Sequence, residues 1–280
     1  AILELSGIEF TAKRFEQAAR LLRRLRRVKE TNSAQIPPEV WEQATYRLAV
    51  CELELERLPE AAELFEEFVD AFPQSPLTAS AGFFCGETLF KLGRHEQAVK
   101  HLTRVREKFD DDPVFGPSLL RLGESLAALQ RWARSERVFS EYLDRFKDSP
   151  QAFQARFGIG WARENQQRHD EAISAYRQVT AEHQGPTAAR AQFQIGECLF
   201  AKKRYDEAVR ELLKVDILYA YPEWSAAALY EAGRCFEKLG KSVEARAQFK
   251  QVAEQHGKTR WAELASRRLS EIAGAGVPGR

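Results

Sequence analysis

The segment FQIGECLFAKKRYDEAVRELLKV, residues 193–215, contains two apolar patterns of helical spacing joined by a short basic stretch. The apolar residues of its first half fall within two helical turns, and those of its second half recur at intervals of four and three residues. Gly196 and Ala208 are its small residues, and antiparallel helices approach within about 8–10 Å only where facing side chains are small. The segment therefore predicts a helix, a tight turn and a second helix, with Gly196 and Ala208 at their contact.

The same arrangement recurs along the chain with a nearly fixed period. A glycine marks each copy at steps of 37, 37, 36 and 37 residues, and a small residue follows each glycine by twelve. The glycines are Gly86, Gly123, Gly160, Gly196 and Gly233, and the small residues are Ala98, Ser135, Ala172, Ala208 and Ala245. Such a period is typical of a solenoid, in which each unit buries its apolar face against its neighbours. The sequence therefore predicts an all-α fold with one continuous core.

With the glycine placed at the eighth position of the unit, residues 193–215 resemble a tetratricopeptide repeat (TPR). The shared features are an aromatic residue in the second turn, another just before the shared turn, and alanine at the twentieth position. The resemblance covers nearly the whole chain. It implies a TPR-like α-solenoid of antiparallel helix pairs that forms a right-handed superhelix, with a C-terminal capping helix.

The repeats predict a single TPR solenoid over residues 1–273, followed by a flexible tail at 274–280. An insertion, TNSAQIPPEV, separates a partial first unit from the rest. The units are 1–41 (partial), 42–78, 79–115, 116–152, 153–188, 189–225 and 226–262, with the capping helix at about 259–273. The chain begins inside the predicted first helix without methionine or a signal peptide, which predicts a processed chain or a fragment of a longer array.

The period of 37 exceeds the 34 residues of the common TPR, and the connectors are rich in proline and serine. Examples are FPQSPLTAS and FKDSPQAFQA. This style is similar to the bacterial cell-envelope TPR proteins of the BamD and CpoB (YbgF, Tol-Pal-associated) type. The resemblance implies a periplasmic or envelope location and partners that are membrane-protein or lipoprotein segments. A cytoplasmic location is the alternative.

Composition narrows the class of partner. The 280 residues include 42 basic and 41 acidic side chains, a net charge of +1, which disfavours a large nucleic-acid interface. No apolar run reaches the roughly 18–20 residues that span a bilayer. The basic residues of 20–29 follow a helical pattern, which is typical either of a surface for membranes or acidic partners, or of a solvated face beside an acidic neighbour. Glu52 and Glu67 belong to such an acidic stretch in the next unit.

The cysteines and histidines predict packing rather than chemistry. Cys51, Cys85, Cys198 and Cys235 all lie inside first helices, and the sequence has no C-x-x-C pair for zinc. Equivalent cysteines of adjacent units lie on the order of 10 Å apart, beyond disulfide reach. Four of the five histidines occupy positions that are aromatic in other units. We therefore expect no catalytic residue, no metal site and no cofactor.

The first helices supply the candidate binding site. In TPR folds these helices line the concave face, and the resemblance assigns the fifth, ninth and twelfth unit positions to it. Aromatic residues with charged neighbours at these positions are typical of a peptide-binding surface. The candidates are Tyr46, Phe83, Glu87, Phe90, Glu124, Phe157, Trp161, Phe193, Glu197, Phe200, Tyr230 and Arg234.

Two interpretations of this aromatic stripe remain open at the sequence level. It lines a groove, or it packs between successive units as core. The ninth position favours the groove, because Glu87, Glu124, Glu197 and Arg234 would not be buried unpaired. Trp161 in the same column is the predicted exposed anchor.

The sequence thus predicts a non-enzymatic scaffold that binds a peptide or protein segment in its concave groove. An envelope-assembly role follows from the second resemblance. The alternatives are a cytoplasmic TPR adaptor, and a TPR fragment of a larger protein whose catalytic domain lies outside this chain.

Overall fold

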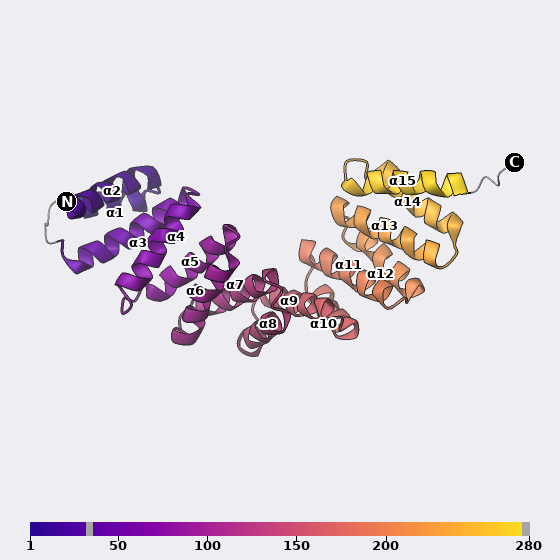
Figure 1. The fold of residues 1–280 in the computed structure, drawn as a ribbon, viewed down its shortest axis with the longest axis horizontal. Coiled ribbons are helices and arrows are strands. Elements are labelled where there is room, and N and C mark those ends of the chain that lie inside the picture. The colour runs from indigo at the N-terminus through magenta and orange to yellow at the C-terminus, as the bar shows by residue number, and fades with distance from the viewer. Residues whose placement is uncertain (32–35, 276–280) are drawn as a thin grey trace. The chain divides into compact units, whose positions relative to one another are not determined.

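The computed structural model describes residues 1–31 and 36–275 (Figure 1). Over these residues the chain forms fifteen α-helices and no strand. Consecutive helices pack side by side as antiparallel pairs joined by short turns. The predicted α-solenoid is confirmed.

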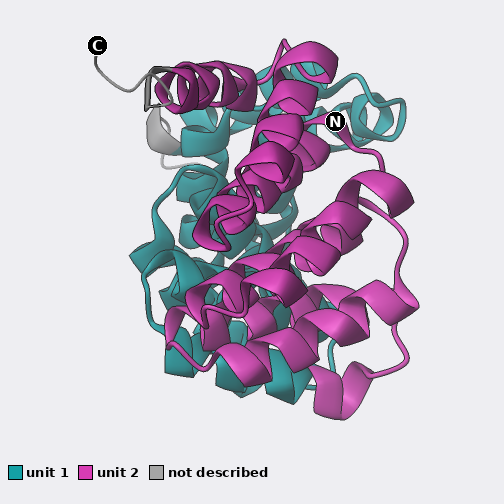
Figure 2. Cartoon of the chain, turned by 90° about the vertical axis from the view of Figure 1, so that its right-hand side faces the viewer, with its two compact units in different colours: residues 1–142 teal, residues 143–280 magenta. Residues whose placement is uncertain are grey.

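The chain divides into two compact units, Ala1–Tyr142 and Leu143–Arg280 (Figure 2). Unit 1 contains α1 (Ile2–Thr11), α2 (Phe15–Thr31), α3 (Pro38–Glu54), α4 (Leu58–Ala71), α5 (Thr78–Lys91), α6 (His95–Lys108) and α7 (Phe115–Ala128). Helix α8 (Trp132–Phe146) includes the boundary. Unit 2 contains α9 (Ala152–Asn165), α10 (His169–Glu182), α11 (Pro186–Ala201), α12 (Tyr205–Leu218), α13 (Pro222–Lys238), α14 (Ser242–Gln255) and α15 (Arg260–Ala275).

The helix starts lie close to the predicted unit boundaries. The first helices of the six full units begin at residues 38, 78, 115, 152, 186 and 222, within four residues of the predicted starts. The partial unit at 1–41 holds a helix pair of its own, α1 and α2. Helix α15 continues through residues 274 and 275, where the tail was expected to begin, and residues 276–280 lie outside the described ones.

The repeated glycines allow the two helices of a pair to touch. A Cβ atom built on Gly196 would lie 2.4 Å from Cγ of Leu212, too close for any real contact. Ala208, twelve residues after Gly196, is fully buried in the same pair. In the pair α7–α8, the hydroxyl of Ser135 donates a hydrogen bond of 2.8 Å to the carbonyl of Gly123. The predicted contact between the two small positions is therefore present there.

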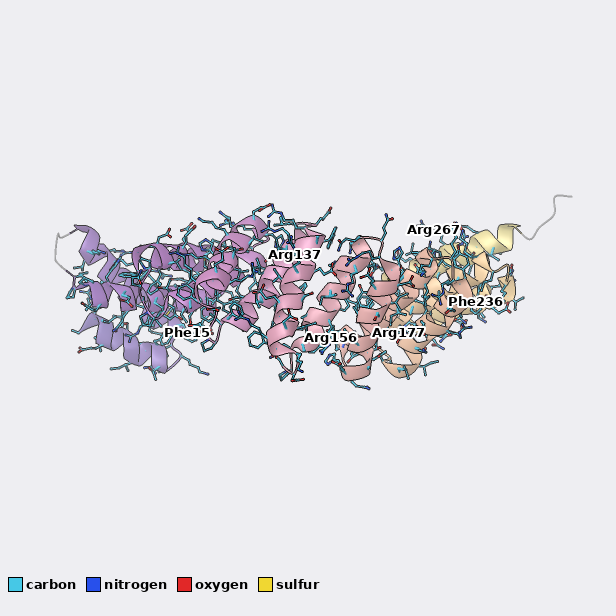
Figure 3. The ribbon with its side chains drawn as sticks, turned by 90° about the horizontal axis from the view of Figure 1, so that it is seen from below. Phe15, Arg137, Arg156, Arg177, Phe236 and Arg267 are labelled. Atoms are coloured by element: carbon cyan, nitrogen blue, oxygen red, sulfur yellow. The ribbon has the colours of Figure 1, made fainter. Side chains whose placement is uncertain are left out.

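Within each unit, helices contact their neighbours in sequence, from α1 to α7 in unit 1 and from α9 to α15 in unit 2, and first helices also contact one another. Helix α5 packs against α7 in unit 1, and in unit 2 α11 packs against α9 and α13. Partly buried aromatic side chains pack against the buried cores. Phe15 packs on the core around Leu22, and Phe236 packs on that around Phe249 (Figure 3). In unit 2 the first helices α9, α11 and α13 thus form a continuous layer that extends to α15.

The turn inside each of the seven helix pairs contains one residue with left-handed backbone. These residues are Lys13, Glu56, Gly93, Gln130, Gln167, Lys203 and Gly240, with φ between 56° and 72°. In the turn after α11, the Lys203 N–H donates to the Phe200 carbonyl at 2.8 Å and the Arg204 N–H donates to the Leu199 carbonyl at 2.9 Å. Such bonds satisfy the carbonyls that a helix end leaves free.

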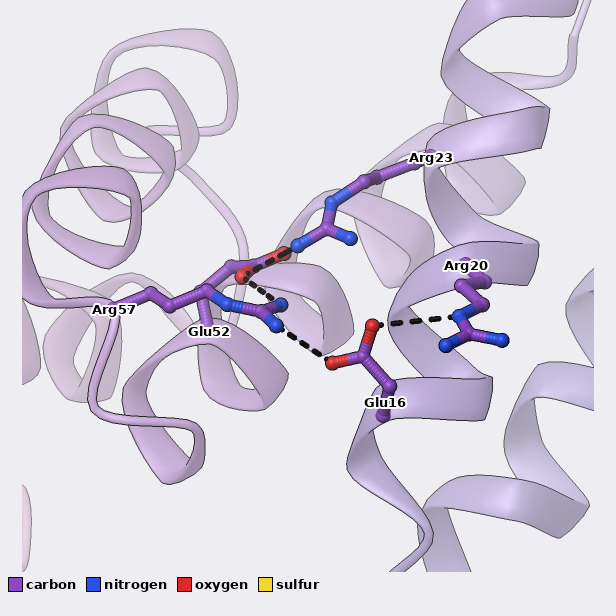
Figure 4. A network of polar contacts seen from close by, with 5 residues as sticks. All are labelled: Glu16, Arg20, Arg23, Glu52 and Arg57. Atoms are coloured by element: carbon purple, nitrogen blue, oxygen red, sulfur yellow. Dashed lines mark hydrogen bonds and ion pairs between the residues drawn. The ribbon is translucent and has the colours of Figure 1, made fainter.

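The Arg-rich helix α2 pairs with acidic residues of the next helix pair (Figure 4). Glu52, only 1% exposed, accepts hydrogen bonds of 2.5 and 2.8 Å from Arg23 and one of 3.3 Å from Arg57. Arg57 also donates to Glu16 at 2.7 Å. Two guanidinium groups therefore stabilise the buried carboxylate of Glu52. Burying a charged group costs free energy unless it is paired and hydrogen-bonded.

A second contact follows one turn further along α2. Arg26 donates to both carboxylate oxygens of Glu67, at 3.1 and 2.8 Å, and its guanidinium lies 5.1 Å from the ring centre of Trp41. Glu52 and Glu67 are the acidic neighbours that the sequence offered as one explanation of this basic helix. For Arg23 and Arg26 the structure shows that explanation.

All four cysteines are buried and free. Burial, the largest cause in each case, raises the thiol pKa of Cys51, Cys85 and Cys235 to about 12, and that of Cys198 in the same direction. Because the thiolate is the reactive form, these thiols are protected in the folded chain.

We therefore expect Ellman's reagent to react slowly with the native protein. After denaturation without reductant, it should titrate four thiols. Recovery of two or fewer would show that a disulfide has formed and would contradict the register of the repeats.

Candidate functional site

A groove in unit 1, formed mainly by the first helices α3, α5 and α7, contains the predicted residues Phe83 and Glu87. Its volume is about 970 Å³. Apolar side chains and charged ones both line it: Leu53, Leu58, Phe83, Phe84, Glu54, Glu56, Glu87, Lys91 and Arg121. We call this set the unit 1 groove. Its volume lies in the range of ligand-binding clefts, and its mixed lining is the kind that fixes both affinity and orientation.

Arg121 joins three of the predicted residues at this groove. Its guanidinium donates to Glu87 at 2.6 and 3.2 Å and also pairs with Glu124. The same group lies 4.5 Å from the ring centre of Phe90. The sequence analysis did not select Arg121. Its position three residues before Glu124, on the same face of α7, is the signal that could have identified it.

Glu124 is a half-buried carboxyl group. Burial raises its pKa, the charge of Arg121 opposes this, and the charge of Glu87 adds to it. The ion pairs of Arg121 therefore hold a partly buried charge network at the margin of the groove. Such a network favours a fixed arrangement of donors and acceptors.

Tyr46 and Phe83 serve both core and surface. Tyr46 is half-buried, with its ring centre 6.1 Å from that of Phe65 and 5.4 Å from that of Phe68. Phe83 is also half-buried and lies against Phe84 in the unit 1 groove, with ring centres 5.4 Å apart. Both side chains therefore expose part of an aromatic ring over a packed base.

In unit 2 the corresponding residues form a face on α9, α11 and α13. Trp161 and Phe157, one turn apart on α9, are half-buried. The guanidinium of Arg190 from α11 lies 5.1 Å from the Trp161 ring centre and 4.8 Å from that of Phe157. We call this surface the unit 2 face. Its residues are Phe157, Trp161, Glu164, Arg190, Glu197, Phe200, Tyr230, Glu231 and Arg234.

Other aromatic residues of the stripe differ in exposure. Phe193 is 8% exposed and packs against Trp224, with ring centres 5.6 Å apart. It therefore belongs to the core rather than the surface. Tyr230 is half-buried, with its ring centre 5.4 Å from those of both Phe249 and Trp261. The stripe is thus partly core and partly surface.

The charged residues of the unit 2 face are held by different partners. Arg234 donates to both oxygens of Glu231, at 3.0 and 2.7 Å, and its guanidinium lies 4.9 Å from the ring centre of Phe200. On α9, Glu164 accepts hydrogen bonds from the Tyr176 hydroxyl and the Gln194 amide. Both donors to Glu164 are neutral groups.

Glu197 departs from the expectation that an ionisable side chain at the ninth position is either exposed or paired. Its Oε1 atom is enclosed and has no hydrogen-bond partner. Burial raises the pKa of Glu197 to about 8, and the charge of Glu231 adds to this while Arg234 opposes it. The physical reason for the departure is that burial and the charge of Glu231 favour the protonated form of the carboxyl group, which lowers the cost of leaving it without a partner.

Over the residues that the structure describes, no three His, Cys, Asp or Glu side chains are placed to hold a metal ion. None of the described helices is both long enough and apolar enough to cross a membrane.

Comparison with known protein families supports the repeat that the sequence predicts. One tetratricopeptide-repeat family model matches residues 8–76, 85–150, 120–182 and 160–223, and a second matches residues 227–259. Because these matches cover most of the chain, it belongs to the tetratricopeptide-repeat family. A search of curated proteins finds no match.

Solved structures share the fold at low sequence identity. The C-terminal part of a TPR repeat-containing protein from Cytophaga hutchinsonii is 14% identical, with a TM-score of 0.69 over 94% of this chain and 98% of that one. A tetratricopeptide repeat protein from Parabacteroides merdae is 16% identical, with a TM-score of 0.58 over 97% of each chain. MamA from Desulfovibrio magneticus is 21% identical, with a TM-score of 0.54 over 63% of this chain and 93% of that one. The likeness is one of fold.

Proposed function

We propose that this chain is a non-enzymatic scaffold that binds an extended or helical segment of another protein on its first-helix faces. Tetratricopeptide repeats are protein-interaction modules, which supports the general class. The observation that carries the site is the unit 1 groove, where Phe83, Leu53 and Glu87 surround about 970 Å³. Exposed aromatic rings on a packed base give contact area at low entropic cost, and the charges fix orientation.

The proposal assigns Trp161 as the anchor of the unit 2 face. Its ring is half-buried beneath Arg190, so a partner side chain can complete its burial without a large rearrangement. The guanidinium also keeps the ring in one orientation through a cation–π contact. Pre-ordering of this kind lowers the cost of binding.

The test begins with a pull-down from the source cells and identification of the partner by mass spectrometry. We expect Trp161→Ala and Phe83→Ala to weaken binding of the purified partner by about 2 kcal/mol or more, roughly 30-fold, because truncated aromatic anchors typically cost this much. Isothermal titration calorimetry gives the affinity, and thermal melting gives the stability of each variant.

The matched controls are exposed aliphatic residues on other surfaces. Val243 on α14 is 80% exposed and Ile217 on α12 is 75% exposed, and both lie on second helices. Val243→Ala and Ile217→Ala should retain both affinity and melting temperature. Full affinity in Trp161→Ala and Phe83→Ala would remove the first-helix faces from the binding site.

We further propose the cell envelope as the compartment, on the resemblance of the Pro/Ser-rich connectors to envelope TPR proteins. For the Arg-rich helix we propose no lipid contact, because Arg23 and Arg26 already pair with Glu52 and Glu67. Fractionation of the source cells with an antibody to the chain tests the compartment. Recovery in the cytoplasm would favour an adaptor role instead.

A further inference from the structure

The two units fill one recurring pair of positions with opposite charges. In unit 1 the pair is Glu87 at the ninth position of one repeat and Arg121 at the sixth position of the next. In unit 2 the corresponding residues are Glu197 and Glu231, at the same separation in sequence. A carboxylate therefore stands in unit 2 where unit 1 has a guanidinium group.

This exchange leaves Glu197 without the partner that Glu87 has. Glu87 accepts hydrogen bonds of 2.6 and 3.2 Å from Arg121. Glu197 has an enclosed Oε1 atom with no donor, and no described cation lies within ion-pair distance of it. Glu231 is 4% exposed, and its Oε2 atom forms an ion pair with Nη1 of the nearby Arg234, at 2.7 Å.

The surroundings of Glu197 contain more negative than positive groups. Glu164 faces it from α9, while Glu231 and Arg234 face it from α13. Glu164 is bonded to neutral donors only, Tyr176 and Gln194. Among the described residues, Glu231 is the one of these three carboxyl groups that forms an ion pair with Arg234. The raised pKa of Glu197 shows the consequence, because a bound proton is the simplest way to neutralise such a group.

We propose that a Lys or Arg side chain of the partner segment pairs with Glu197 on the unit 2 face, beside the Glu231–Arg234 ion pair. The incoming cation takes the place that Arg121 holds in unit 1. Phe200, one turn beyond Glu197 on α11, is half-buried and already contacts one guanidinium group, so it can flank the stem of a second cationic side chain. This inference rests on the proposed function and adds to it the charge of the recognised residue.

Binding of the cation is coupled to the loss of one proton from Glu197. Glu197 holds its proton in the free protein at neutral pH and releases it to solvent when the cation binds. Binding therefore strengthens as pH rises toward about 8, by up to about tenfold per pH unit, and levels off above that value. The affinity of a lysine peptide falls again only where lysine itself loses its proton, near about pH 10.

The experiment uses the full chain and a phage-displayed library of random decapeptides. We expect the selected peptides to carry Lys or Arg at one fixed position. One selected peptide is then synthesised with that residue and with Gln in its place, and both are titrated by calorimetry. The Gln peptide should bind at least about tenfold more weakly, since charge-assisted hydrogen bonds are the strong ones.

Three variants test the assigned residues. Glu197→Gln should abolish both the preference for the cation and the rise of affinity between pH 6 and pH 8. Glu231→Arg reproduces the unit 1 pair within unit 2 and should likewise lose the preference for the cation. Glu263→Gln, an exposed residue of α15, is the matched control and should change neither. Calorimetry in two buffers of different ionisation enthalpy should detect proton release with wild type and none with Glu197→Gln.

The outcomes separate this inference from the proposed function. Selected peptides that bind in a Trp161-dependent manner but lack a fixed cation would overturn the inference and leave the scaffold function standing. So would an unchanged preference for the cation in Glu197→Gln, or enrichment of acidic peptides. Failure to select any peptide, together with partner binding that is insensitive to Trp161→Ala and Phe83→Ala, would overturn both.

Discussion

Replacing Tyr176 with alanine is expected to lower the free energy of unfolding by about 3–5 kcal/mol, the range found for large aromatic residues in protein cores. Tyr176 is fully buried on α10. Its ring fills the space beside Gly160, where a Cβ atom would lie 2.6 Å from the ring. Truncation would leave a cavity at the contact between α9 and α10. Urea denaturation followed by circular dichroism at 222 nm measures the loss.

The control is Tyr176→Phe, which keeps the ring and removes only the hydroxyl. That hydroxyl donates to the Glu164 carboxylate at 2.7 Å, so the loss should be about 1.5–3 kcal/mol, typical of a hydrogen bond to a charged group. Equal stabilities for the Ala and Phe variants would mean that the ring does not support the helix pair. The packing assigned to this position would then be wrong.

A second large effect is expected from Gly196→Ala. Alanine is ordinarily the better helix former by about 1 kcal/mol, so an exposed helix would gain stability. Here the added Cβ would lie 2.4 Å from Leu212, and both residues are buried. Overpacking of this kind typically costs about 1–3 kcal/mol, which corresponds to a fall in melting temperature of roughly 2–12 °C for a chain of this size. Differential scanning calorimetry measures the shift.

Gly7→Ala is the matched control for this substitution. Gly7 also lies inside a helix, α1, but its added Cβ would meet only the guanidinium end of Arg47, at 3.1 Å. A flexible side-chain end can move aside, so the helix preference of alanine should prevail. A melting temperature for Gly196→Ala that equals or exceeds wild type would refute the close-approach argument.

The sequence predicts the helix pairs well because each pair encodes its own contact. Gly123 and Ser135 stand twelve residues apart and meet through a hydrogen bond, as the spacing of small residues indicates. Helix starts follow from the same period to within a few residues. The tail shows the limit of this approach, since nothing in Gly274 and Ala275 predicts that α15 includes them.

The candidate site is less predictable because it depends on contacts between repeats. Arg121 and Glu87 are far apart in the sequence, and only the packing of α5 on α7 brings them together. Phe193 shares its column with half-buried rings, yet Trp224 covers it from the next first helix, α13. Glu197 was expected to be exposed because it is ionisable, whereas its neighbours shift its protonation instead. Column position alone does not contain this information.

The left-handed residue in each helix-pair turn bears on how this protein could be engineered. Five of the seven turns place a residue with a side chain at this position, Lys203 among them, while two use glycine. A side chain in this conformation costs roughly 1 kcal/mol or more relative to glycine. Replacing such a residue with glycine should therefore raise thermostability. Lys13, Gln130, Gln167 and Lys203 are positions of this kind away from the unit 1 groove and the unit 2 face. The stability of the scaffold and its binding specificity can therefore be changed at different residues.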